Sequence, residues 1–336
     1  ILVEMAKFKL ERNDPVVALG GGVTGDLAGF AAAIYRRGVP IIQCPTTLLS
    51  MVDAAVGGKT AVNLAMGEGS LADLKKNLIG AFHQPSVVLA DVSTLTTLPP
   101  RILHSGLAEC IKHGMLGHHG GDPGLFPWLE SVLDQIMAYE PAALAELVSR
   151  NVAIKAHIVR GDEREEAEDE VGGRALLNLG HTFAHAIETI SHLTPDGQLK
   201  NAPLQHGEAV ALGLVAACAT SQALGLVDAA FLARIRELIR RAGLPTAIAG
   251  LPTPAEFIAR MMHDKKVSAG RLRLIIPQPI PTASTTMSMP KSIPRASETA
   301  LIPQPGYATV MNNPPIEAIE AGIAAIQIRD GAFRKD

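Results

Sequence analysis

The sequence has few cysteines, few aromatic residues and no excess of positive charge. Cys44, Cys110 and Cys218 are scattered and form no CxxC pair, which argues against a disulfide framework and indicates a reducing, cytoplasmic setting. Aromatic residues make up 4% of the chain and the formal net charge is −3, so neither base stacking nor a basic surface supports nucleic-acid binding. No apolar run reaches transmembrane length and no basic, apolar leader opens the chain, so we expect neither membrane insertion nor export.

The length of the chain predicts more than one domain, because 336 residues exceed what a single hydrophobic core usually holds. Short apolar runs at residues 15–19, 39–43 and 87–91 alternate with helical stretches, which predicts a parallel, Rossmann-like α/β sheet. Helical periodicity dominates after residue 100, apart from a strand signal at residues 271–276. We expect an α/β domain over residues 1–100, an all-α domain over residues 101–276, and an irregular Pro/Ser/Thr-rich segment with a terminal helix over residues 277–336.

A glycine loop after the first predicted strand is typical of phosphate binding. Gly20-Gly21-Gly22-Val23-Thr24-Gly25-Asp26 leads into a helix, whose N-terminal N–H groups can bind a pyrophosphate. The triplet is not a GxGxxG fingerprint, so a tight structural turn is an alternative. Thr46-Thr47 and Thr96-Thr97 add hydroxyl groups at ends of predicted elements, and helix capping is the alternative there.

Two lysines occur in stretches that we interpret as glycine-rich loops. Lys59 lies in the sequence VGGKT, and Lys76 precedes Asn77 after an inserted stretch near residues 67–74. A lysine in such a loop binds phosphate as a point charge. The alternative is an ordinary solvated surface lysine.

Two histidines and one glutamate have the composition of a catalytic zinc site. His181 and His206 supply imidazoles, and Glu109 is a carboxylate in an otherwise apolar helix, where it needs a partner or a metal. Two histidines, one carboxylate and an open position are a zinc pattern that supports catalysis. Composition alone leaves rival ligands, which are His104, His113, His118 and His119.

A run of polar residues predicts one helical face that binds an anionic substrate. Arg174, Asn178, His181 and His185 follow one another at spacings of four, three and four, which predicts a single helix over residues 174–191. A guanidinium, an amide and two imidazoles suit a metal together with an oxygen-rich anion. Lys112 lies three residues after Glu109, so it forms either a surface salt bridge or a contact with the substrate.

Several motifs, in order along residues 15–276, resemble the 3-dehydroquinate synthase family of sugar phosphate cyclases. The resemblance implies an NAD-binding α/β domain that lacks the family's N-terminal portion, followed by an all-α metal-binding domain. It also implies a homodimer that uses NAD and Zn²⁺, with Co²⁺ as a substitute. The motifs are GGGVTGDLAGF at residues 20–30, RGVP at 37–40, PTTLL at 45–49, GGKTAVN at 57–63, KNLIGAF at 76–82, GLAE at 106–109, DERE at 162–165, NLGHT at 178–182, HGEAVA at 206–211 and DKK at 264–266.

The family reaction that the resemblance implies converts 3-deoxy-D-arabino-heptulosonate 7-phosphate into 3-dehydroquinate and phosphate, a step of the shikimate pathway. It comprises transient oxidation by NAD, elimination of phosphate, re-reduction and an intramolecular aldol closure. The family motifs assign the metal to Glu109, His181 and His206. They assign the cofactor to Gly22, Val23, Thr24, Gly25, Asp26, Thr46, Thr47, Lys59, Lys76, Thr94, Leu95, Thr96 and Thr97. They assign catalysis and substrate binding to His185, Asn178, Lys112, Lys155, Arg174, Asp53, Asn77, Lys265, Lys266 and Arg37, of which Arg37 reaches the neighbouring subunit.

Three alternatives stay open at this point. A related cyclase such as 2-deoxy-scyllo-inosose synthase would share the metal ligands and the glycine loop, although the retained Arg174, Asn178 and His185 favour dehydroquinate formation. A polyol dehydrogenase of the glycerol dehydrogenase type would share the architecture and would produce NADH. An inactive remnant would bind metal or sugar phosphate without NAD, because the chain begins at Ile1 without the family's first strands.

Overall fold

The computed structural model describes residues 1–65, 74–167, 173–193, 203–262, 272–278 and 305–328. The Cα atoms group into two compact units, each of which takes in two stretches of the chain. Unit 1 comprises Ile1–Leu107 and Asp134–Arg164, and unit 2 comprises Ala108–Leu133 and Glu165–Asp336. The domain boundary at residue 100 stays a prediction.

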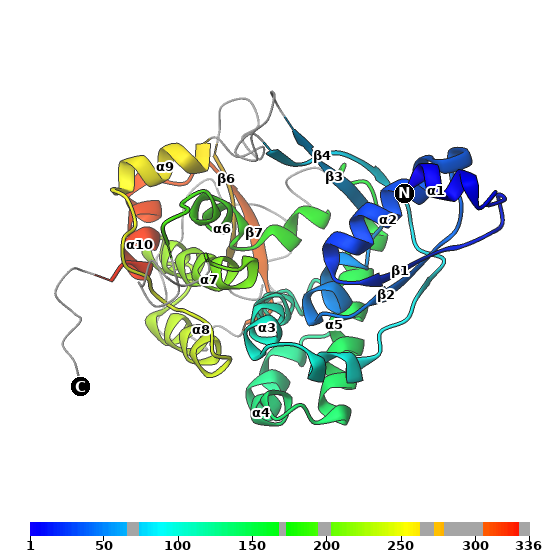
Figure 1. Ribbon diagram of the computed structural model, residues 1–336. Coiled ribbons are helices and arrows are strands. Elements are labelled where there is room, and N and C mark those ends of the chain that lie inside the picture. The colour runs from blue at the N-terminus through cyan, green and yellow to red at the C-terminus, as the bar shows by residue number, and fades with distance from the viewer. Residues whose placement is uncertain (66–73, 168–172, 194–202, 263–271, 279–304, 329–336) are drawn as a thin grey trace. The chain divides into compact units, whose positions relative to one another are not determined.

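A parallel sheet forms the centre of unit 1, as the sequence predicts. β1 (Val16–Gly20), β2 (Ile41–Pro45) and β5 (Val87–Val88) pair in the order β1-β2-β5. Helix α2 (Gly22–Ile34) begins two residues after β1 ends and packs on the sheet (Figure 1). Its small residues Ala31 and Ala32 are buried against the strands, so the helix lies close to the sheet and its N-terminus lies at the carboxyl end of β1.

An antiparallel hairpin in unit 1 departs from the sequence prediction. β3 (Lys59–Ala65) pairs with β4 (Leu74–Phe82), so Lys59 and Lys76 lie in strands and not in glycine loops. The glycine turn ends at Gly58, whose φ of +67° is left-handed, and the chain is extended from the next residue onward. Gly80 is required by the pairing, because a Cβ there would lie 2.3 Å from the carbonyl oxygen of Thr60.

The remaining elements of unit 1 are mostly helical. Helix α5 (Pro141–Gly161) packs on a π-helical turn, Ser50–Ala54, and on a 3-10 helix, Val92–Thr97. Helix α1 (Leu2–Lys7) opens the chain, and α3 (Pro100–Met115) begins in this unit and continues into unit 2.

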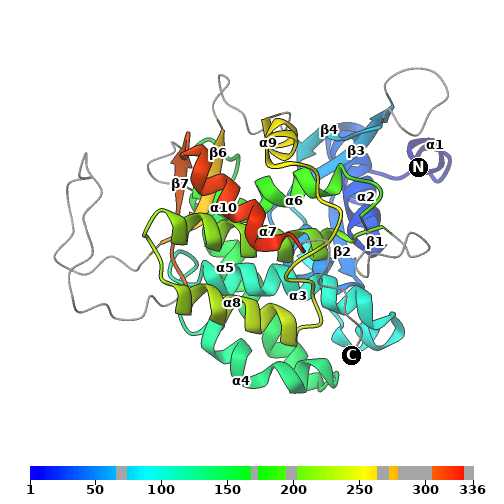
Figure 2. The ribbon, with the colours of Figure 1, turned by 90° about the vertical axis from the view of Figure 1, so that its left-hand side faces the viewer.

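Unit 2 is built around a buried helix, α7 (His206–Ala223). Fifteen of its eighteen residues are buried, because α6 (His181–Glu188), α8 (Ala229–Arg241) and α10 (Ile316–Ile326) pack against it (Figure 2). A helix that is apolar on every side needs such complete cover. Helix α9 (Pro254–Met262) also belongs to unit 2, whereas α4 (Leu125–Met137) begins in unit 2 and ends in unit 1. Helix α10 matches the terminal helix predicted from the sequence.

A second antiparallel pair belongs to unit 2. β6 (Arg273–Pro277) matches the strand signal at residues 271–276, and it pairs with β7 (Ala308–Asn312). The prediction of an irregular segment is therefore wrong for β7, whose five residues follow a Pro/Ser/Thr-rich stretch that dominates the local composition. Residues 279–304 lie outside the described residues.

The single helix predicted over residues 174–191 is two elements. Gly173–Asn178 is a 3-10 helix, and α6 starts at His181 after Gly180, which has a left-handed φ of +75°. The break has a packing cause, because the Gly180 carbonyl oxygen approaches Gly213 of α7 so closely that a Cβ there would lie 2.2 Å away. Arg174 and Asn178 therefore do not share a continuous helical face with His181 and His185.

Candidate functional site

A buried carboxylate is the centre of the candidate site in unit 2. Glu109 lies on α3, its side chain is 0% exposed, and neither carboxylate oxygen has a hydrogen-bond partner within the described part of the chain. Its neighbours are charged or ionisable groups instead. Oε2 forms an ion pair with the Lys112 ammonium, and Oε1 lies 3.4 Å from Nε2 of both His181 and His206. A carboxylate in such surroundings requires a compensating cation.

Three elements bring these side chains together. Glu109 comes from α3, and His181 and His206 are the first residues of α6 and α7. The start of α7 is fixed by a capping box, in which the Glu208 carboxylate accepts a hydrogen bond from the Gln205 N–H at 2.7 Å. One ligand atom from each of Glu109, His181 and His206 lies within 4.8 Å of the other two.

The protonation of the cluster follows from these contacts. Burial alone would raise the pKa of Glu109, but the charges of Lys112 and His181 outweigh it and hold this pKa well below its usual range. Burial disfavours a charged His206, whereas the nearby carboxylates of Glu109 and Glu188 favour it more strongly and raise the pKa of His206 to about 10. The cluster therefore holds a positive charge next to Glu109, which a divalent cation can supply in place of the proton.

The two imidazoles are oriented through their other nitrogens. Nδ1 of His181 lies 3.2 Å from the Leu179 carbonyl oxygen, and Nδ1 of His206 lies 2.7 Å from Oε1 of Glu188. Ligand histidines are commonly held this way, with Nε2 turned toward the metal. Sequence reasoning missed Glu188. The available signal was its spacing of seven from His181, which places both residues on one face of a helix.

These residues fit a divalent transition metal. Two imidazole nitrogens and one carboxylate oxygen converge, each from a side chain whose other polar atoms are engaged or charge-compensated. That donor set is the one that catalytic zinc sites use, with the fourth position open for water or substrate. The observation on which this fit depends is the fully buried Glu109 carboxylate, whose Oε1 has no hydrogen-bond partner among the described residues and lies 3.4 Å from both imidazole nitrogens.

Several other predicted residues of unit 2 lie in buried or partly buried positions. Lys112 is 2% exposed, so its salt bridge with Glu109 is not the surface contact that the sequence suggested as an alternative. Arg174 is buried, and His185 is half-buried with its ring centroid 5.6 Å from that of His181. The Asn178 amide donates to Oε1 of Glu165 at 3.3 Å. Lys265 and Lys266 lie outside the described residues.

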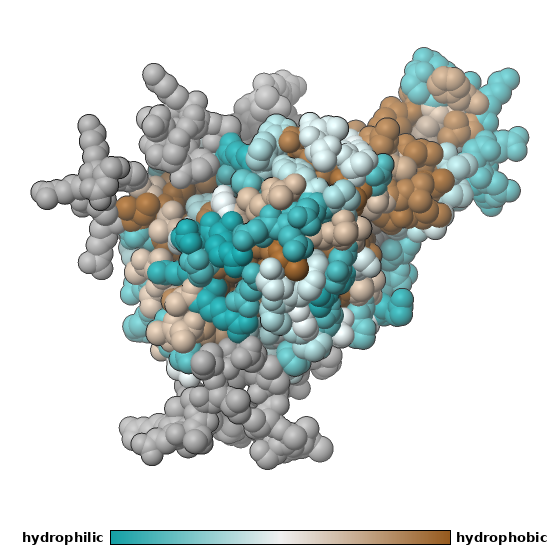
Figure 3. Space-filling view, turned by 90° about the horizontal axis from the view of Figure 1, so that it is seen from below, coloured by the Kyte–Doolittle hydropathy of each residue, from teal (hydrophilic) through white to brown (hydrophobic). Residues whose placement is uncertain are grey.

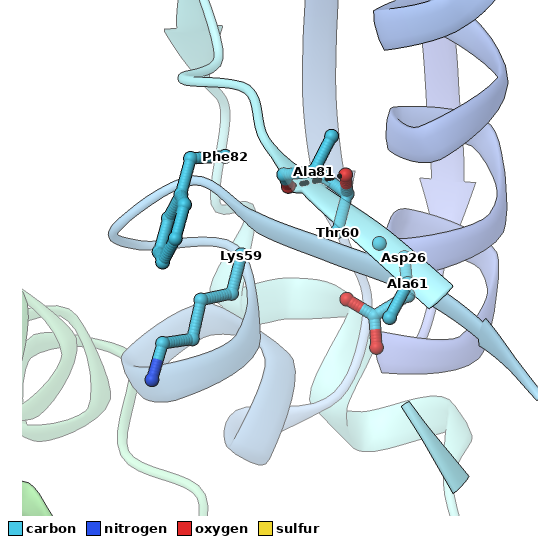
Figure 4. Close-up of a pocket in the computed structure, with 7 residues that line it drawn as sticks. Asp26, Lys59, Thr60, Ala61, Ala81 and Phe82 are labelled. Carbon is cyan, nitrogen blue, oxygen red and sulfur yellow. Dashed lines mark hydrogen bonds between the residues drawn. The ribbon is translucent and has the colours of Figure 1, made fainter. Parts of the chain in front are cut away.

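Unit 1 contains a cavity of about 310 Å³ beside the glycine loop. Asp26 of α2, Lys59 of β3 and Phe82 of β4 line it, and Figure 4 shows the Lys59 ammonium and the Asp26 carboxylate on the same side of the hairpin. Burial and the charge of Asp53 raise the pKa of Asp26 to about 6, against an opposing effect of Lys155. A cavity of this size, with an anionic and a cationic group at its wall, suits part of a small polar ligand.

A second polar pair of unit 1 joins Asp53 and Lys155. The Lys155 ammonium lies 2.7 Å from Oδ1 of Asp53, and it also donates to the backbone carbonyl oxygen of Asp53. Lys155 is 8% exposed and Asp53 is 27% exposed, so the lysine is fixed and the carboxylate is partly accessible. This pair gives Asp53 a defined position at the π-helical turn.

The remaining predicted cofactor residues occupy varied positions. Gly22, Val23, Thr24 and Gly25 form the first turn of α2, and the side chain of Val23 is 83% exposed. The Thr47 hydroxyl accepts a hydrogen bond from the Ser50 N–H. The side chain of Leu95 is fully buried. The hydroxyls of Thr94, Thr96 and Thr97 donate to backbone carbonyls three residues earlier. Thr46 is half-buried, Arg37 is exposed with a φ of +67°, and the side chains of Lys76 and Asn77 lie outside the described part of the structure.

Two family models match this chain. The family model for the N-terminal part of 3-dehydroquinate synthase matches residues 1–105, and the model for its C-terminal part matches residues 106–267. The chain belongs to the 3-dehydroquinate synthase family. The resemblance inferred from the motifs is thereby confirmed.

Solved structures of sugar phosphate cyclases share the fold. The 2-epi-5-epi-valiolone synthase from Streptomyces hygroscopicus subsp. jinggangensis 5008, with NAD⁺ and Zn²⁺ bound, is 27% identical, with a TM-score of 0.73 over 97% of this chain and 77% of its own. A 2-deoxy-scyllo-inosose synthase is 25% identical, with a TM-score of 0.64 over 84% of this chain and 71% of its own. Another structure of that enzyme type, with carbaglucose-6-phosphate, NAD⁺ and Co²⁺, is 23% identical, with a TM-score of 0.64 over 85% of this chain and 74% of its own. At that identity the likeness supports the fold alone.

None of the helices in the described ranges combines the length and the apolar character that crossing a membrane would require.

Proposed function

We propose that this protein is a 3-dehydroquinate synthase, which converts 3-deoxy-D-arabino-heptulosonate 7-phosphate into 3-dehydroquinate and phosphate in the cytoplasm. The observation that carries the proposal is the buried cluster of Glu109, His181 and His206 in a chain that both 3-dehydroquinate synthase models match. The reaction is a carbon–oxygen lyase step that eliminates phosphate and closes a carbocycle.

The metal ligands in this proposal are Glu109, His181 and His206. The bound Zn²⁺ or Co²⁺ supplies Lewis acidity to a hydroxyl group of the substrate. The low pKa of Glu109 means that its carboxylate is available to a cation at neutral pH. Support also comes from the 27% identical valiolone synthase, which holds Zn²⁺.

NAD is the second cofactor in this proposal, and unit 1 supplies its contacts. When bound, NAD would supply both the hydride acceptor and, as NADH, the hydride donor of the later re-reduction, so the overall reaction would have no net redox change. The first turn of α2 offers backbone N–H groups and the positive end of the helix dipole to a pyrophosphate. Asp26 and Lys59 offer hydrogen bonds to the polar groups of a nucleotide at the cavity wall.

The substrate carries two anionic groups, a carboxylate and a phosphate, and buried cations give them a matching environment. Lys112 and Arg174 bind its carboxylate, hydroxyl or phosphate oxygens, and Asn178 adds an amide. His185, half-buried with its ring centroid 5.6 Å from that of His181, is the proton-transfer residue of this proposal. Asp53, held by Lys155, orients a substrate hydroxyl. The other assignments of the motif comparison, Asn77, Lys76, Lys265 and Lys266, complete the set, and Arg37 serves a neighbouring subunit in a homodimer.

A second candidate function is the formation of a carbocycle from a different sugar phosphate. The solved structures that resemble this chain at 27% and 25% identity form 2-epi-5-epi-valiolone and 2-deoxy-scyllo-inosose. Dehydroquinate formation differs from these reactions in requiring a substrate carboxylate, so the choice of substrate separates the candidates.

The test is a turnover assay with three sugar phosphates, which are the heptulosonate phosphate, a heptulose 7-phosphate without the carboxylate and glucose 6-phosphate. Phosphate release is measured with NAD and Zn²⁺, then without NAD and with a chelator, and each carbocycle is identified by mass. We expect dehydroquinate from the heptulosonate only, with both cofactors required. Turnover of a carboxylate-free sugar alone would favour the second candidate, and bound zinc without turnover would favour an inactive remnant.

A further inference from the structure

A single carboxylate links the two helices that carry the candidate histidine ligands. Glu188 is the last residue of α6, and its Oε1 lies 2.7 Å from Nδ1 of His206, the first residue of α7. His181 opens the same α6 helix, seven residues earlier, so one face of α6 presents both a ligand and this carboxylate. No family motif that we identified assigns a role to Glu188.

The contact fixes which nitrogen of His206 is available. An ionised carboxylate can only accept a hydrogen bond, so Nδ1 of His206 carries the proton. In a neutral imidazole the lone pair is then on Nε2, which is the nitrogen that lies 3.4 Å from Oε1 of Glu109. The carboxylate also sets the plane of the ring and increases the electron density that Nε2 can donate.

The two imidazoles differ in the group that faces Nδ1, which is a side-chain carboxylate for His206 and a backbone carbonyl for His181. The acceptor for Nδ1 of His181 is the backbone carbonyl of Leu179, two residues away, which no side-chain substitution removes. The capping box of Gln205 and Glu208 fixes the start of the α7 backbone. The side chain of His206 is 34% exposed, so packing alone leaves its ring room to rotate.

We propose that Glu188 is a positioning residue for the metal centre, which holds His206 in the tautomer and orientation that binds a divalent cation. This inference rests on the metal ligands of the proposed function. Loss of an outer carboxylate of this kind typically weakens metal binding by about 10- to 100-fold. We expect Glu188→Gln to show a loss in that range.

The experiment is a Co²⁺ titration of the metal-free full chain, followed by visible absorption. Glu188→Gln keeps the shape of the side chain and removes its charge. Glu237→Gln is the matched control, since Glu237 makes an exposed ion pair with Arg240 on α8. The melting temperature of each metal-free variant reports on folding, and Glu188→Asp tests whether a carboxylate on a shorter side chain restores binding in part.

The expected result has three parts. Glu188→Gln binds Co²⁺ about 10- to 100-fold more weakly with an altered absorption spectrum, Glu237→Gln matches the wild type, and the metal-free melting temperatures of the two variants agree. Unchanged affinity and spectrum in Glu188→Gln, with a wild type that binds Co²⁺, would overturn the role of Glu188 alone. A wild type that binds no Co²⁺ would overturn the metal centre and the inference together.

Discussion

The two units of this chain bury their central elements to different degrees. In unit 2, Leu212, Leu214 and Val215 of α7 are all 0% exposed. In unit 1, Val17 and Leu19 of the parallel strand β1 are 58% and 69% exposed, and apolar side chains gather on the surface of the N-terminal part (Figure 3). Parallel strands normally bury both faces. The candidate ligand His206 therefore begins a largely buried helix, whereas the glycine loop follows a strand that has solvent-exposed apolar side chains on one face.

This difference has a consequence for the two cofactors of the proposed enzyme. Metal ligands need positions fixed to a fraction of an ångström, and a helix buried on all sides supplies that rigidity. The glycine loop binds through backbone N–H groups, which the local turn and helix place. Disturbing one unit should therefore affect its own cofactor first, and the following variants test that separation.

The largest effect is expected from His181→Ala, which removes one of three candidate ligands in unit 2. Metal affinity should fall by roughly a thousandfold or more, and turnover should fall to background with it. NAD affinity, which we assign to unit 1, should stay within about twofold of the wild type. Zinc content and NAD titration measure the two quantities on the same sample. Retained zinc stoichiometry would remove His181 from the ligand set.

Gly213→Ala tests how strictly the core of unit 2 is packed. The added Cβ would lie 2.2 Å from the Gly180 carbonyl oxygen, so α6 and α7 must move apart. We expect the free energy of unfolding to fall by about 2 to 3 kcal/mol, with weaker metal binding because both helices begin with a ligand. Gly161→Ala is the control, since a Cβ there meets nothing within 4 Å. Equal stability of the two variants in chemical denaturation would contradict the close approach.

Asp26→Asn tests the electrostatics of unit 1. The folded-state pKa of about 6 lies above the ordinary 3.8, so the folded protein binds the extra proton, and stability falls as pH rises through about 6. Asparagine does not ionise, so it removes the free-energy cost of a charged Asp26 in the folded protein. After allowance for solvent, the variant should gain about 1 to 2 kcal/mol over the wild type between about pH 4 and pH 7. Denaturation at several pH values measures this. A constant difference across that range would exclude the raised pKa.

The smallest effect is expected from Leu19→Thr on β1, in comparison with Leu214→Thr on α7. Leu19 is 69% exposed, so its replacement should change the free energy of unfolding by no more than about 0.5 kcal/mol. Leu214 is 0% exposed, and the same change there should cost about 3 kcal/mol or more. Similar costs at both positions would mean that the face of β1 is covered in solution.

Sequence patterns predicted the elements whose periodicity is undisturbed. The parallel strands of unit 1 and the long helices of unit 2 follow from apolar spacing, and the motifs identified the three residues that converge as candidate ligands. The break at Gly180 was missed because helical spacing of polar residues continues across it. Its cause is a contact with Gly213, more than thirty positions away, which local periodicity does not encode.

Other features depended on neighbours that a single sequence does not reveal. Lys59 follows two glycines and resembled a loop residue, although pairing with β4 makes it the start of a strand. Glu188 resembled an ordinary acidic residue at a helix end, and only the position of His206 gives it a partner. The burial of Lys112 likewise follows from packing around α3.

The most direct test of the central claim is a zinc titration of the metal-free protein with NAD and 3-deoxy-D-arabino-heptulosonate 7-phosphate present. Our account predicts that phosphate release and dehydroquinate formation rise together and saturate near one zinc per chain. Formation of dehydroquinate without zinc would contradict the proposed metal centre. Absence of dehydroquinate at full zinc occupancy would contradict the proposed reaction.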